Sequence, residues 1–173
     1  MKVNASKINI GWHWITRCTH WTIAILFFLN YFFTEPGYEV HIYIGWTIFG
    51  LVLLRVIWGT TFAKGPNHIK NFIPTKSGLK THLSELKTRQ AVDHIGHNAF
   101  GSFAIFLIWA CLLAAAFTGW LQDTDWGFDN GVDDWHESIV DFLWILAVIH
   151  ILAVIFTSIW LRRNLIKQMI VGK

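Results

Sequence analysis

The sequence has little of what holds a soluble domain together. Only 14% of its 173 residues are charged, three are proline and two are cysteine. Cys18 and Cys111 both fall inside apolar runs and no Cys-x-x-Cys-His motif is present, so we expect neither disulfide bonds nor a haem attached through cysteine. The sequence contains no internal repeat and no low-complexity segment. So few charges exclude an ordinary soluble domain of this size.

The chain has instead four long apolar runs. Hydrophobic residues make up 54% of it, and the mean hydropathy is +0.43. The runs, at about 12–33, 41–59, 98–121 and 137–161, are each long enough to cross a hydrocarbon layer about 30 Å thick as a helix. The first run lacks a small-x-small cleavage pattern, so we interpret it as an uncleaved span. The sequence predicts one all-α membrane domain over residues 1–173, built as a four-helix bundle.

The placement of charge predicts how the bundle is oriented. Lysine and arginine occupy the N-terminus, the connection 60–96 and the tail after residue 161. The connections 34–40 and 122–136 contain no Lys or Arg, and their acidic residues are Glu35, Glu39, Asp123, Asp125, Asp129, Asp133 and Asp134. By the positive-inside rule, both termini are cytoplasmic. Within 60–96, a stripe formed by Leu79, Leu83 and Leu86 predicts a short amphipathic helix on the membrane surface. It serves either to dock lipid or a partner or as a solvated connector.

Four histidines fall at two matched depths in the predicted spans. His136 and His150 stand fourteen residues apart, so they leave almost the same helix face about 21 Å apart. His41 opens the second span at the level of His136, and His20 lies in the first span at the level of His150. We therefore expect His41 to pair with His136, and His20 to pair with His150.

Two imidazoles at each level are the axial ligands that a six-coordinate haem requires inside a helical bundle. They are too few for a tetrahedral zinc site or a comparable copper site, and Cys18 is the only thiol near the deeper level. The sequence thus predicts two haems with His20, His41, His136 and His150 as iron ligands. For His41 or His136 taken alone, an interfacial residue at a helix end is the alternative.

Two arginines are candidate partners for haem propionates. Arg55 lies fourteen residues after His41, at the depth of the inner haem, where an unpaired cation would cost about 2.5–3.5 kcal/mol or more. Arg17 lies about one turn below His20 and either binds a propionate or reaches the lipid headgroups.

Three further positions are candidates near the cofactors. Gly45, one turn after His41, leaves room for a flat macrocycle, although small residues also serve ordinary helix packing. His97, at the start of the third span, either contacts the inner haem, shapes a quinone site or caps the helix at the interface. Asp141 lies inside the outer leaflet, where a carboxylate is a candidate proton relay.

Several short motifs together carry a family resemblance. They are Arg17-x-x-His20-Trp21, His41-x3-Gly45 with Arg55-x-x-Trp58-Gly59, His97-Asn98-x-x-Gly101 with Thr118-Gly119, Trp135-His136-Glu137 with His150, and the tail from Asn164 to Lys173. In this combination the chain resembles the bacterial cytochrome b561 family, which includes the b-type cytochrome subunits of nickel-iron hydrogenases. It lacks the C-terminal extension common in the hydrogenase-type subunits, which argues against a dedicated hydrogenase partner.

The resemblance implies a multi-pass cytochrome of the bacterial inner membrane with two b haems. Such a protein belongs to a respiratory chain and passes electrons between the quinone pool, ubiquinone or menaquinone, and a redox partner on the outer face. The acidic outer connections would attract a basic periplasmic partner, either a small c-type cytochrome or a redox subunit. Besides lipid and quinone, a second copy of the chain is an open alternative as a partner, and we expect no nucleic acid.

Two other functions stay open at this point. Some relatives in the family oxidise superoxide and reduce ubiquinone, but a funnel for superoxide should present cations outside, where this chain presents carboxylates. The other alternative is a haem-free membrane scaffold or transporter whose histidines are incidental. That protein would be colourless when purified, whereas the leading hypothesis predicts a b-type spectrum.

Overall fold

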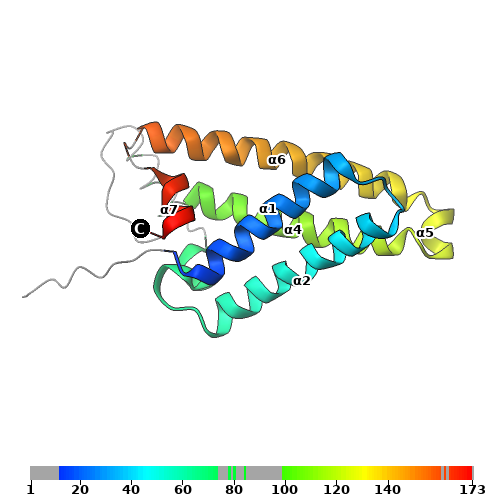
Figure 1. The fold of residues 1–173 in the computed structure, drawn as a ribbon, viewed down its shortest axis with the longest axis horizontal. Helices are drawn as coiled ribbons and strands as arrows, with labels where there is room; N and C mark the ends of the chain where they lie inside the picture. The colour runs from blue at the N-terminus through cyan, green and yellow to red at the C-terminus, as the bar shows by residue number, and fades with distance from the viewer. Residues whose placement is uncertain are drawn as a thin grey trace, which may run out of the picture.

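The computed structural model describes residues 12–73, 78, 80, 84, 99–160, 162 and 164–172, and this part of the chain is all helical. Its four long helices are α1 (Trp14–Phe33), α2 (Glu39–Thr61), α4 (Ala99–Leu121) and α6 (Val132–Trp160). They lie alongside one another, and successive helices run in opposite directions (Figure 1). The all-α prediction is confirmed. The largest shift of a boundary is at α6, which begins five residues before the predicted span because Asp133 and Asp134 form its first turn.

Four short elements complete the described chain. Two 3-10 helices follow α2, η1 (Gly65–Asn67) and η2 (Ile69–Phe72), while α5 (Asp125–Asp129) precedes α6 and α7 (Leu165–Val171) follows it. Each of the two short α-helices starts at a polar cap: the side chain of Thr124 accepts a hydrogen bond from Gly127 N at 3.1 Å, and that of Asn164 accepts one from Lys167 N at 2.8 Å. Of the predicted surface helix, Gly78, Lys80 and Ser84 are described and are helical, whereas the stripe of Leu79, Leu83 and Leu86 lies outside the described residues.

Three helices in the described part of the chain are long and apolar enough to cross a membrane: α2, α6 and residues Phe100–Leu121 of α4. The first predicted span forms α1, whose 20 residues would extend about 30 Å. Because Arg17, His20 and Asn30 make α1 more polar, it is not one of these three. That α1 also crosses the membrane remains a prediction.

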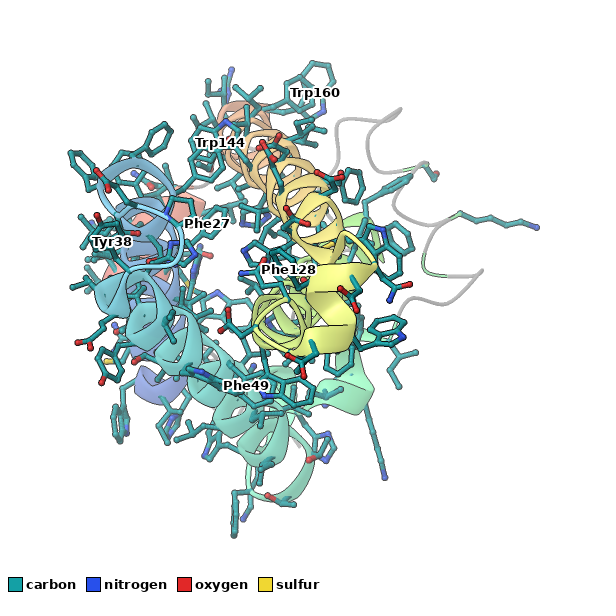
Figure 2. All side chains as sticks on the ribbon, turned by 90° about the vertical axis from the view of Figure 1, so that its right-hand side faces the viewer. Phe27, Tyr38, Phe49, Phe128, Trp144 and Trp160 are labelled. Atoms are coloured by element: carbon teal, nitrogen blue, oxygen red, sulfur yellow. The ribbon has the colours of Figure 1, made fainter. Side chains whose placement is uncertain are left out.

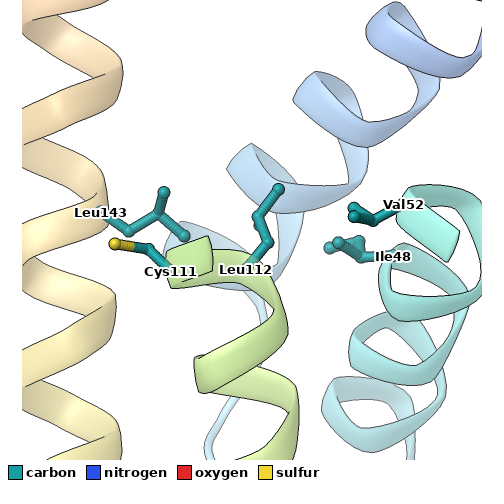
Figure 3. Packing of buried hydrophobic residues seen from close by; sticks show 5 residues of the cluster. All are labelled: Ile48, Val52, Cys111, Leu112 and Leu143. Atoms are coloured by element: carbon teal, nitrogen blue, oxygen red, sulfur yellow. The ribbon is translucent and has the colours of Figure 1, made fainter. Parts of the chain in front are cut away.

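The helices pack as two pairs, α1 with α2 and α4 with α6, and contacts between α2 and α4 join the pairs. Close approaches between α1 and α6 are sparse by comparison. The buried core consists of Ile48 and Val52 from α2, Cys111 and Leu112 from α4, and Leu143 from α6 (Figure 3).

The core lies midway between the two predicted histidine levels. Ile48 follows His41 by seven residues and Leu143 follows His136 by seven, so each lies about 10 Å further along its helix. Well-packed apolar side chains therefore separate the level of His41 and His136, predicted to be the outer one, from the level of His20 and His150, predicted to be the inner one.

Candidate functional site

The outer histidines face each other across the molecule. His41 on α2 and His136 on α6 have ring centroids 6.2 Å apart, with 69° between the ring planes. They line a hollow to which α1, α2, α4 and α6 all contribute, and its other lining residues include Tyr31, Gly45 and Gly119. Seen along the molecule from the α5 end, the α1–α2 pair and the α4–α6 pair lie on opposite sides (Figure 2).

Hydrogen bonds orient both outer imidazoles. Nδ1 of His136 lies 2.9 Å from the carbonyl oxygen of Ala115, and since a carbonyl only accepts, this nitrogen carries the proton. Nδ1 of His41 lies 3.0 Å from Oγ1 of Thr34, whose own hydroxyl donates to the carbonyl oxygen of Asn30 at 2.7 Å. Nδ1 of His41 is therefore the donor in its bond as well. In both rings Nε2 keeps its lone pair, which is the arrangement found in metal-binding histidines.

The inner histidines form a second pair. His20 on α1 and His150 on α6 have ring centroids 6.3 Å apart, with 63° between the planes. Trp21 stacks on His20, with the centroids 5.3 Å apart and the planes within 5° of parallel. Because His150 follows His136 by fourteen residues on one helix, the inner pair lies about 21 Å from the outer one. The structure thus brings together the two pairs that depth counting predicts.

The separation within each pair fits a haem iron held between two imidazoles. A metal–imidazole bond is about 2.0–2.1 Å long and the ring centroid lies about 1.1 Å behind the nitrogen, so two opposed imidazoles on one metal have centroids about 6.2–6.4 Å apart. The measured centroid distances are 6.2 and 6.3 Å. At the outer level, Gly45 lines the hollow between the two imidazoles, and a Cβ there would meet nothing within 4 Å.

Gly119 on α4 supports the outer pair, although it was not a candidate from the sequence. A Cβ there would lie 3.2 Å from Cε1 and 3.4 Å from Nδ1 of His136, closer than most side chains tolerate. Glycine therefore lets α4 lie this close to the imidazole without displacing it, whereas a Cβ would require a shift of a few tenths of an ångström. The signal in the sequence was the Thr118-Gly119 motif, which carries no information about its spatial neighbour.

Arg55 is buried near the end of α2, with 5% of its surface exposed. Its guanidinium carbon lies 5.2 Å from the ring centroid of Trp58 and 5.7 Å from that of Trp109, and Nη2 donates to the carbonyl oxygen of Asn67 at 3.4 Å. Two aromatic faces and a carbonyl thus stabilise this cation. Its predicted contact with a propionate stays a prediction.

Of the two remaining predicted cofactor residues, Arg17 contacts α7 and His97 lies outside the described residues. Nη1 of Arg17 donates to the carbonyl oxygen of Ile170 at 2.7 Å, and Nε1 of Trp21 donates to that of Met169 at 3.1 Å. These bonds dock the end of α7 on α1, a use of Arg17 that neither sequence-based alternative included. His97 lies outside the described residues, as do its neighbours His94 and Asn98.

Apolar helices that hold paired imidazoles at two depths define the class of helical membrane cytochromes. The chain belongs to the prokaryotic cytochrome b561 family, whose family model matches residues 11–172. Membership makes it a membrane protein that binds b-type haem and transfers electrons. Comparison with curated proteins and with solved structures gave no match.

Proposed function

We propose that this protein carries electrons across the bacterial inner membrane through two b haems. His41 and His136 hold the outer haem, and His20 and His150 hold the inner one. The observation that carries the proposal is the centroid spacing of 6.2 and 6.3 Å in two pairs that lie fourteen residues apart along α6. Four helices cross the membrane as a bundle, and both termini are cytoplasmic.

The chemistry divides between the cofactor and the chain. Haem supplies an iron that gains and loses one electron at a time. The chain fixes the imidazoles through the Ala115 carbonyl and the Thr34 hydroxyl, which raise the basicity of the ligands and prevent the rings from turning. Gly45 makes room for the outer macrocycle. Arg55 and Arg17 supply positive charge for the propionates of the inner haem. His97 contacts the same haem from the start of the third span.

Two partners exchange electrons with the haems. One is a quinone from the lipid, ubiquinone or menaquinone. The other is a basic periplasmic redox protein such as a small c-type cytochrome, which docks on the acidic outer face, where Asp123, Asp125 and Asp129 surround a hollow at α5. If this attraction speeds docking, raising the ionic strength slows the reaction, because salt screens charges over about 10 Å at 0.1 M. A rate that is independent of salt would contradict the steering.

The central experiment is a haem count with a redox titration on single histidine variants of the purified protein. We expect two haems per chain in the wild type and one in each of the His20→Ala, His41→Ala, His136→Ala and His150→Ala variants. The first and last lose the same haem, and the middle two lose the other. His68→Ala is the matched control, because the side chain of His68 belongs to neither pair and caps η2 by accepting a hydrogen bond from Lys70 N at 3.1 Å.

The control variant His68→Ala must keep both haems. A colourless wild-type protein, or variants that all lose haem equally, would refute the assignment of the ligands. Rapid superoxide consumption by the wild type, coupled to quinone reduction, would show instead that the protein is a self-contained oxidoreductase.

A further inference from the structure

One polar contact inside the apolar belt joins α1 to α6 near the outer histidine pair. The hydroxyl of Tyr31 donates to Oδ1 of Asp141 at 3.0 Å. Asp141 is the only Asp, Glu, Lys or Arg between Ser138 and Trp160, and its side chain is exposed on the surface of α6. It lies five residues, about 7.5 Å, further along the helix than His136. A carboxylate that faces hydrocarbon is costly unless it has polar partners, so this position calls for hydrogen-bond donors.

Aromatic rings surround the contact. Trp144 stacks on Tyr31 with ring centroids 5.2 Å apart and planes within 16° of parallel, and Phe32 meets Trp144 edge-on at 5.0 Å. The ring centroids of Phe28 and Phe32 lie 4.8 Å apart, and about half of the surface of each of these two phenylalanines is exposed. Figure 2 shows Trp144 where α6 faces α1. The polar pair therefore sits beside flat apolar surfaces that the lipid can reach.

Tyr31 also borders the outer histidine site. Its side chain helps to line the hollow that contains His41 and His136. Tyr31 thus contacts an exposed carboxylate on α6 and also helps to line the hollow that contains the outer imidazoles.

We propose that Tyr31, Asp141 and Trp144 bind the headgroup of a quinol that enters from the outer leaflet. A carboxylate accepts hydrogen bonds from up to four lone-pair positions, so Asp141 can accept one from a quinol hydroxyl while it keeps the bond from Tyr31. Trp144 offers a flat face to the ring, and the apolar tail follows the exposed side chains of Phe28 and Ile145. This inference rests on the proposed function, which requires a quinone but gives it no place.

The chemistry also sets which redox form binds. The oxygens of a quinone only accept hydrogen bonds, as does an ionised carboxylate, so the oxidised form cannot replace the reduced one at Asp141. The site therefore prefers quinol to quinone. A contact that merely ties α1 to α6 would show no such preference.

The test measures binding to the haem-loaded protein in lipid nanodiscs by calorimetry. A short-chain ubiquinol is titrated into protein whose haems are already reduced by dithionite, so that no quinol is consumed, and the matching quinone is titrated into the oxidised protein. We expect Asp141→Asn to weaken quinol binding at least tenfold and to remove the preference for the reduced form. Tyr31→Phe weakens binding several-fold. The matched controls, Glu35→Gln and Tyr43→Phe, change it less than twofold.

Photolabelling of the wild type tests whether quinol binds at this site even if Asp141→Asn fails to fold. An azidoquinone, reduced before illumination, should label the peptides that contain Phe32 and Trp144. Wild-type affinity in both variants, or label confined to other helices, would overturn the inference. If label lies elsewhere while quinol still reduces a two-haem protein, only this site is refuted and the proposed function stands. A wild type without haem refutes the proposed function, and the labelling still gives its own answer because it requires only protein and lipid.

Discussion

Leucine at Gly45 should remove the outer haem, whereas leucine at Gly50 should not. Both glycines lie inside α2, and at neither position would a Cβ meet another atom within 4 Å. They differ in what they face. Gly45 lines the hollow between His41 and His136, and Gly50 is exposed on the helix surface. The protein alone therefore tolerates a side chain at both positions, and only a bound macrocycle distinguishes them.

The substitutions at Gly45 should have opposite effects on the stability of the haem-free protein and on its capacity to bind haem. Glycine inside a helix costs about 0.5–1 kcal/mol relative to alanine, so Gly45→Ala and Gly50→Ala should each stabilise the haem-free protein by about that amount. In Gly45→Leu the larger side chain enters the hollow, so haem content falls from two per chain to one. In Gly50→Leu it stays at two.

A pyridine haemochrome assay gives the haem count, and thermal unfolding followed by circular dichroism gives the stability of the haem-free protein. Two haems in Gly45→Leu would show that no macrocycle occupies the hollow beside His41. An equal loss of haem in Gly50→Leu would show that any bulk on α2 has the same effect, which would also refute the reasoning.

Three other substitutions probe the surroundings of the histidines. Gly119→Ala places a Cβ 3.2 Å from Cε1 of His136, so hemin titration should show the outer site weakened about 10–100-fold and the inner site unchanged. Arg55→Leu removes two cation–π contacts, which should cost about 1–2 kcal/mol in thermal unfolding, and it should lower the potential of the inner haem in a redox titration because a cation favours the reduced iron. An unchanged potential would contradict the predicted propionate contact. Arg17→Ala removes the bond to the Ile170 carbonyl, so α7 should be cleaved faster in limited proteolysis, and wild-type resistance would show that α7 is held by other contacts.

Counting residues along apolar runs was enough to pair the histidines, because a helix rises by a constant amount per residue. Fourteen residues separate His136 from His150, so the distance between the two levels along α6 depends on the sequence alone. The helical spans followed from the same runs. Hydrophobic length therefore determines both the elements and the heights of the candidate ligands.

The contacts around the ligands could not be predicted in this way. The Nδ1 partner of His136 is a backbone carbonyl on α4, and any residue at position 115 would supply one. Asp141 stood out as an intramembrane carboxylate, but the choice of Tyr31 as its partner depends on how α1 and α6 are rotated. The docking of Arg17 on α7 likewise requires the tail to fold back, which hydrophobic runs do not specify.

The distance between the two histidine levels has an electrical consequence. An electron that moves from one level to the other travels about 21 Å of a hydrocarbon layer about 30 Å thick, or roughly seven tenths of the transmembrane voltage drop. A full crossing is worth about 2.3 kcal/mol per 100 mV, so this step is worth about 1.6 kcal/mol per 100 mV. If the two histidine pairs hold haems as proposed, a membrane potential of about 100 mV would thus shift the distribution of charge between the levels more than tenfold.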